Sequence, residues 1–176
     1  RAFDPNLSGA VNTFALQSDG KIIVGGEFTA MRPNGTTTTV IRAHLARLNA
    51  DGTVDSAYDP NVNNLVLTTA LQADGKLLVG GPFTAVQPNG ATDSTLRKYA
   101  ARLNTNGTVD ATFDLDLNEL SGSRVDSWLV LADGRLLLAG TFTSLQPLGA
   151  TARLPRNHFA RLNANGTLDA AFLPGV

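Results

Sequence analysis

The chain has 176 residues, enough for one domain or two small ones, and its 14 basic and 15 acidic residues give a formal net charge of −1. A charge this balanced excludes strong electrostatic attraction to nucleic acid or to a membrane surface. The chain has no cysteine, which excludes disulfides, thiolate catalysis and zinc–thiolate sites. No apolar run approaches the roughly 20 residues of a membrane-spanning helix, so we expect no membrane insertion.

Four strands are predicted at the start of the chain. Residues 11–17 (VNTFALQ) roughly alternate between apolar and polar, and residues 21–28 (KIIVGGEF) contain the consecutive apolar residues of a strand covered on both faces. The third and fourth strands are predicted over 44–49 (HLARLN) and 53–58 (TVDSAY). The SDG and ADG turns between them suit short hairpin loops, in which glycine takes the left-handed position.

The sequence contains three copies of the same repeat unit. The SDGKIIVGGEF hairpin returns as ADGKLLVGGPF and as ADGRLLLAGTF, at spacings of 55 and 59 residues, and the ARLN segment returns with it. Self-similarity of this kind is the signature of a repeat architecture. We therefore divide the chain into repeat 1, repeat 2 and repeat 3, the last of which includes the start of the next phase: residues 1–57, 58–112 and 113–176.

The loop length also predicts a strand register. Closing Asn49 against Thr53 places Arg47 opposite Asp55, and the equivalent pairs follow in the other repeats. We interpret them as structural cross-strand ion pairs, because an active site is rarely needed three times. The other two pairs are Arg102 with Asp110 and Arg161 with Asp169.

The segments DGKIIVGGEF and ARLNADGTVDSAY resemble the delta-sixty repeat, a bacterial propeller-forming family with no assigned activity, over essentially the whole chain. The resemblance implies an all-β fold of three tandem four-stranded blades of a β-propeller. A β-trefoil, in which three units close by themselves, is the alternative. Propellers generally have four to eight blades, so three cannot close a ring. The expected partners are therefore further copies of the chain in a homo-oligomer, or neighbouring repeats of a longer chain.

No catalytic, metal or cofactor site is predicted. His44 and His158 share one repeat position with Tyr99, which favours a structural filler. The NADGTVD segment alternates oxygen-bearing residues as a calcium loop does. However, Asn106 and Asn165 replace Asp51 in the other copies, and Arg47 stands where such a loop would begin. A plain hairpin turn is the favoured interpretation.

The three repeats differ most in sequence at one end of the predicted sheets. Three long loops (residues 29–43, 84–98 and 143–157) and the acidic link over 114–124 share that rim, and binding residues generally sit on such loops. Trp128, the only tryptophan, is predicted as core filler or as a ligand platform. The candidate binding residues are Arg32, Arg42, Arg97, Lys98, Arg153, Arg156, Asp116, Glu119 and Trp128.

These features predict a non-enzymatic extracellular or cell-surface repeat module for adhesion, recognition or assembly through the loop rim. A structural repeat that polymerises into a filament or an oligomeric scaffold is one alternative, and a carbohydrate-binding module is another. The scattered basic residues beside an acidic link suit a surface polysaccharide or a protein better than duplex DNA, so nucleic acid is not an expected partner.

Overall fold

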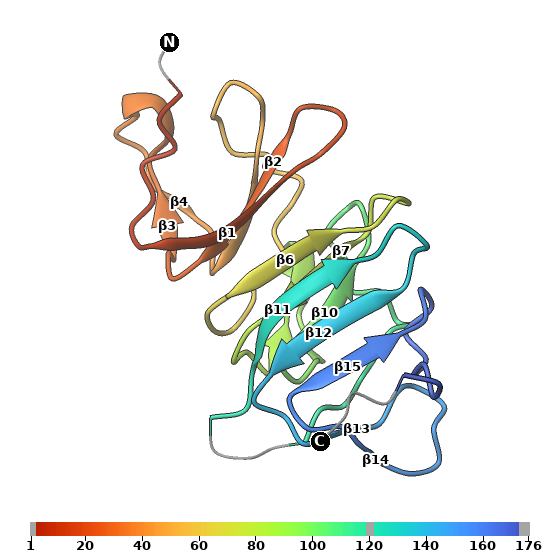
Figure 1. Ribbon diagram of the computed structural model, residues 1–176. Helices are drawn as coiled ribbons and strands as arrows, with labels where there is room; N and C mark the ends of the chain where they lie inside the picture. The colour runs from red at the N-terminus through yellow and green to blue at the C-terminus, as the bar shows by residue number, and fades with distance from the viewer. Residues whose placement is uncertain (1–2, 119–121, 173–176) are drawn as a thin grey trace.

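A computed structural model describes residues 3–118 and 122–172 (Figure 1). Each repeat forms one three-stranded antiparallel sheet, in which the second strand lies between the first and the third. The strands are β1 (Val11–Leu16), β2 (Ile22–Gly26) and β5 (Leu45–Leu48) in repeat 1; β6 (Thr68–Leu71), β7 (Leu77–Gly80) and β10 (Ala100–Leu103) in repeat 2; and β11 (Val125–Val130), β12 (Leu136–Gly140) and β15 (Phe159–Leu162) in repeat 3.

The apolar second strand forms the buried centre of each sheet. In β2, the residues from Ile23 to Gly26 are buried, as expected for a strand covered on both faces. The glycine at its end is required by close packing, because a Cβ at Gly26 would overlap the carbonyl oxygen of Ala10. The register between β1 and β2 shifts at this point, between Val11 and Thr13, and the two strands lie too close together at this bulge for a side chain at Gly26.

Each long loop folds into a small hairpin of its own. These hairpins are β3 (Ala30–Met31) with β4 (Val40–Ile41), β8 (Ala85–Val86) with β9 (Thr95–Leu96), and β13 (Ser144–Leu145) with β14 (Leu154–Pro155). Short 3₁₀ turns join the first two pairs, η1 (Pro33–Gly35) and η2 (Pro88–Gly90). The link before each sheet pairs with its hairpin, through bridges of Leu7 with Met31 and Val62 with Val86 in repeats 1 and 2, and through the Gln146 amide and the Leu115 carbonyl in repeat 3. Loop and link therefore form one rim.

The predicted fourth strand does not form a regular ladder. Residues 53–58 pair with β5 through the single bridge between Leu48 and Val54, and repeats 2 and 3 repeat this arrangement. The chain turns immediately afterwards, because the Asp55 side chain accepts a hydrogen bond from the Ala57 amide and the Tyr58 amide donates to the Asp55 carbonyl. Three strands and one bridge thus replace the predicted four-stranded blade.

Two hydrophobic clusters of the described residues join consecutive sheets, and another lies within repeat 1 around Phe28. The first strands of the repeats, β1, β6 and β11, run side by side in Figure 1, and the Thr13 and Thr69 hydroxyl oxygens lie 2.8 Å apart in a hydrogen bond. One cluster packs Ile23 and Leu45 of repeat 1 against residues of repeat 2 such as Val79. A second cluster joins repeats 2 and 3 around Trp128. No helix in the described part of the chain is long and apolar enough to cross a bilayer.

Candidate functional site

Consecutive repeats are joined through an arginine, which we call the arginine joint. Arg47 Nε donates to Asp55 Oδ2 over 2.9 Å, and its guanidinium lies 4.3 Å from the centre of the Tyr58 ring. Its Nη1 crosses to repeat 2 and donates to the carbonyl oxygen of Thr105 over 2.7 Å. The predicted ion pair is therefore confirmed, and the same arginine also binds the turn of the next repeat.

The second joint has the same geometry. Arg102 Nε donates to Asp110 Oδ2 over 2.8 Å, the guanidinium lies 4.6 Å from the centre of the Phe113 ring, and Nη1 donates to the carbonyl oxygen of Ala164 over 2.8 Å. Arg102 and Asp110 are both buried. A buried charge pair needs this complete set of partners, because removing one charge leaves the other uncompensated.

Each joint contains a second cation, which was not predicted from the sequence. Lys21 Nζ lies 2.8 Å from Asp55 Oδ2, and Lys76 makes the same contact with Asp110. Burial raises the pKa of Asp55, but hydrogen bonds from Lys21, the Ala57 amide and Arg47 outweigh it, so that pKa lies below its ordinary value. The pKa of Asp110 is lowered for the same reasons. The signal was the basic residue that follows the DG turn between the first and second strands of each repeat.

The third joint is incomplete. Arg161 Nε donates to Asp169 Oδ2 over 2.8 Å and its guanidinium lies 4.3 Å from the centre of the Phe172 ring. In the described ranges, however, Arg161 Nη1 has no carbonyl partner of the kind seen in the other joints. At the opposite end, the Ala50 carbonyl is equivalent to those of Thr105 and Ala164, and no arginine among the described residues donates to it. Within residues 3–118 and 122–172, a donor at one end and an acceptor at the other thus lack the partners that their equivalents have inside the molecule.

The two end faces expose apolar side chains at strand positions whose equivalents in other repeats are buried. Phe14 of β1 is 74% exposed, whereas Trp128, at the equivalent position of β11, is 6% exposed. Leu16 is also exposed on the repeat 1 face. On the repeat 3 face, Leu129 is 55% exposed, while its equivalent Ala15 packs into the core. Both faces therefore expose apolar side chains at positions that are covered where two repeats meet.

Four of the predicted rim cations pair with carboxylates of the links. Arg42 lies 3.5 Å from Asp59, Arg97 lies 3.2 Å from Asp114, and Arg153 lies 2.7 Å from Asp116. Lys98 pairs with Asp116 as well, at 3.4 Å. These contacts fasten each long loop to the link beside it and neutralise most of the predicted basic surface.

The remaining candidates are dispersed. Arg32 Nε donates to the Thr39 hydroxyl, and Arg156 Nη1 donates to the Pro155 carbonyl. Trp128 lies in the core between repeats 2 and 3, so it offers no exposed ring face. Glu119 lies outside the described residues. The structure thus brings Arg153, Lys98 and Asp116 together and leaves the other candidates apart.

The histidines and the NG turns have local backbone roles. His44, Tyr99 and His158 all take a left-handed φ of 62 to 67° directly before the third strand, and the Nδ1 of His44 hydrogen bonds with the Gly26 carbonyl. Asp51 Oδ1 accepts hydrogen bonds from the amide and the hydroxyl of Thr53. Among the described residues, no three His, Asp or Glu side chains are placed to hold a metal ion.

Three stretches of the chain match the family described as "Domain of unknown function (DUF5122) beta-propeller". They are residues 17–58, 72–113 and 131–172, which together cover more than half of the chain. The chain belongs to this family. No curated protein matches it.

The DUF5122 stretches coincide with the arginine joints. Each runs from just before a DG turn to the aromatic residue that stacks on the arginine, so residues 17–58 contain Lys21, Arg47, Asp55 and Tyr58. The family description names a β-propeller, in agreement with the all-β sheets and not with the trefoil alternative. A joint and its hairpin are thus the repeating unit of this DUF5122 chain.

Proposed function

We propose that this protein is a non-enzymatic assembly module of the β-propeller class, whose two end faces bind each other in a second copy of the chain. The observation that carries the proposal is the incomplete third joint: Arg161 presents a donor at one end and Ala50 an acceptor at the other. Contact between these faces would reproduce the two joints already present inside the molecule.

The exposed side chains favour the same contact. Phe14 and Leu16 on one face, and Leu129 on the other, are the exposed equivalents of core positions. Burying a side chain of this size contributes about 1.5 to 3 kcal/mol. Contact between two different faces is heterologous, so it gives a closed ring if the rotation closes and a filament if it does not.

The wider proposal is that the assembled module acts outside the cell or at its surface and presents the loop rim to a protein or polysaccharide partner. Support comes from the arrangement of each repeat, where a uniform sheet carries a long and variable hairpin. Several copies of the rim in one assembly would strengthen binding that is weak at each site.

Mass in solution tests the assembly. We expect light scattering across a range of concentrations to show a dimer or a larger oligomer for the natural sequence. Phe14→Glu and Arg161→Glu each damage one face and should lower the mass to that of the monomer. Leu96→Glu, at another exposed apolar position, is the matched control and should assemble normally.

Mixing the two damaged variants tests the head-to-tail geometry. Each variant retains one intact face, so the mixture should form a single joint and stop at a dimer. A monomer at every concentration for the natural sequence would show the proposal to be wrong. A dimer that survives both single variants would show that another surface forms it.

A further inference from the structure

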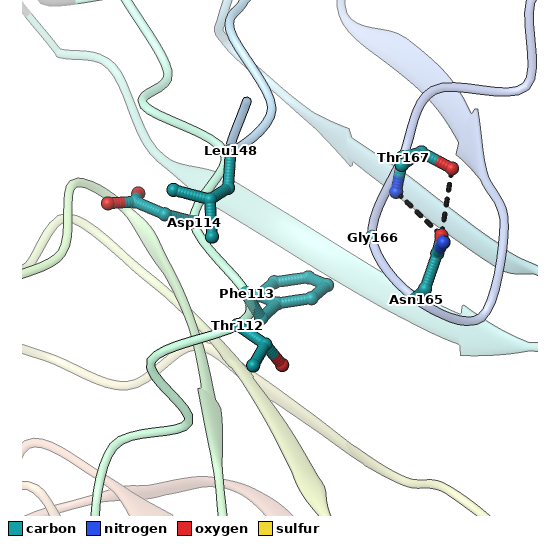
Figure 2. Close-up of a pocket in the computed structure, with 7 residues that line it drawn as sticks. All are labelled: Thr112, Phe113, Asp114, Leu148, Asn165, Gly166 and Thr167. Atoms are coloured by element: carbon teal, nitrogen blue, oxygen red, sulfur yellow. Dashed lines mark hydrogen bonds between the residues drawn. The ribbon is translucent and has the colours of Figure 1, made fainter. Parts of the chain in front are cut away.

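The loop rim of repeat 3 contains a pocket of about 260 Å³. It lies between the link at Phe113 and Asp114, Leu148 of the long loop, and the turn over residues 165–167 (Figure 2). Figure 2 shows Leu148 on the side of Asp114, while Thr167 donates two hydrogen bonds to Asn165 Oδ1 within the turn on the other side.

In the other two repeats an asparagine side chain bridges the equivalent groups. Asn34 Oδ1 accepts a hydrogen bond from the Asp4 amide over 3.1 Å, and its Nδ2 donates to the Asp51 carbonyl over 3.0 Å. In repeat 2, Asn89 joins the Asp59 amide to the Asn106 carbonyl, over 3.0 and 3.2 Å. One primary carboxamide thus satisfies a donor on the link and an acceptor on the turn.

Repeat 3 has a leucine at this position. Leu148 is equivalent to Asn34 and Asn89 (QPLG against RPNG and QPNG), and its side chain can form neither hydrogen bond. Asn34 and Asn89 have φ values of 55° and 53°, in a left-handed region that asparagine adopts readily. The φ of Leu148 is not positive. Leu148 is instead 57% exposed.

The substitution leaves a donor and an acceptor without partners. The Asp114 amide and the Asn165 carbonyl are equivalent to the two groups that each asparagine bridges, and neither forms a hydrogen bond to another described residue. The Phe113 ring and Leu148 border the same pocket and provide an apolar wall.

We propose that this pocket binds the primary carboxamide of a ligand, in the place that the asparagine side chain occupies in repeats 1 and 2. The ligand oxygen accepts from the Asp114 amide and its NH₂ group donates to the Asn165 carbonyl. A short aliphatic stem packs on Phe113 and Leu148. The side chain of an exposed Asn or Gln in a partner, or a free aliphatic amide, has this chemistry.

Titration with propionamide tests the site by amide chemical shifts in ¹⁵N-labelled protein. We expect saturable shifts at Asp114 and Gly166, with half-saturation in the millimolar range for so small a ligand. The equivalent amides Asp4, Gly52, Asp59 and Gly107 are internal controls and should not move. Propionate, which cannot donate a hydrogen bond, should give no such shift.

Two variants that exchange leucine and asparagine at this loop position provide the decisive test. Leu148→Asn should restore the internal bridge and abolish the propionamide shifts in repeat 3. Asn89→Leu should create a second site, with new shifts at Asp59 and Gly107. Shifts that persist in Leu148→Asn, equal shifts in all three repeats, or none in the natural sequence would each overturn the proposal. A glutamine-containing peptide with a free C-terminal carboxylate that binds at least tenfold more tightly than propionamide would identify a protein side chain as the source of the bound carboxamide.

Discussion

The face between repeats 2 and 3 and the outer face of repeat 1 are built from the same strand position, yet one is core and the other is surface. Trp128 is buried against repeat 2, whereas Phe14 at the equivalent position faces solvent. The strand sequences do not explain this difference, because both carry a large aromatic residue. It depends on whether another repeat lies against the strand.

The largest expected effect separates these two aromatic residues. Trp128→Ala should lower the free energy of unfolding by about 3 to 5 kcal/mol, because it leaves a cavity in a packed core. Phe14→Ala should cost less than about 1 kcal/mol in the monomeric protein, because an exposed ring loses few contacts. Urea unfolding at low protein concentration measures both, and equal losses would contradict the comparison.

The arginine joints provide the next test. Arg102→Ala should lower the free energy of unfolding by about 3 kcal/mol, because it leaves Lys76 as the charged partner of the buried Asp110 and breaks the bond to repeat 3. Arg161→Ala should cost about 1 kcal/mol or less in the monomer, since that joint is more exposed and lacks the crossing hydrogen bond. Thermal or urea unfolding of the pair gives the measurement. A greater loss for Arg161→Ala would show that the open joint is already filled.

Acid should weaken the closed joint. Burial raises the pKa of Asp110, but its hydrogen bonds from Lys76, Thr112 and Arg102 lower it further, to below the ordinary 3.8. A carboxylate with a depressed pKa in the folded state stabilises the protein above its unfolded pKa, and this contribution is lost as the pH falls below about 4. The melting temperature should therefore drop between about pH 5 and about pH 3.

Two variants isolate this effect. Asp110→Asn should be less stable than the natural sequence at neutral pH. Its melting temperature should fall less on acidification, because the asparagine at position 110 takes up no proton. Asp93→Asn, in an exposed loop, should keep the natural pH dependence. An unchanged slope in Asp110→Asn would assign the acid sensitivity to other carboxylates.

The smallest expected change in stability is at the tips of the long loops. Asn89→Ala removes two hydrogen bonds between link and turn and should cost about 1 kcal/mol. Leu148→Ala at the equivalent position of repeat 3 should change stability by less than about 0.5 kcal/mol, because its side chain is exposed. Differential scanning calorimetry resolves the two. A costly Leu148→Ala would mean that the leucine closes the pocket.

Much of the fold could be predicted from local pattern. The repeat spacing, the hairpins at the DG turns and the Arg47–Asp55 register follow from short-range rules of turn length and alternation, and the structure confirms them. The fourth strand was overpredicted, because the pattern of residues 53–58 does not reveal that the Asp55 side chain turns the chain. The candidate rim cations were identified by charge alone, which does not show that Arg97 pairs with Asp114.

The sequence by itself determined the repeating unit, since turn residues and strand alternation act over a few neighbouring positions. Only the tertiary structure decided what each unit touches. It placed Arg47 Nη1 on a carbonyl 58 residues away, buried Trp128 while exposing Phe14, and opened a pocket where Leu148 replaces a bridging asparagine. Those outcomes depend on which surfaces meet between repeats, and contacts so distant along the chain leave no trace in local periodicity.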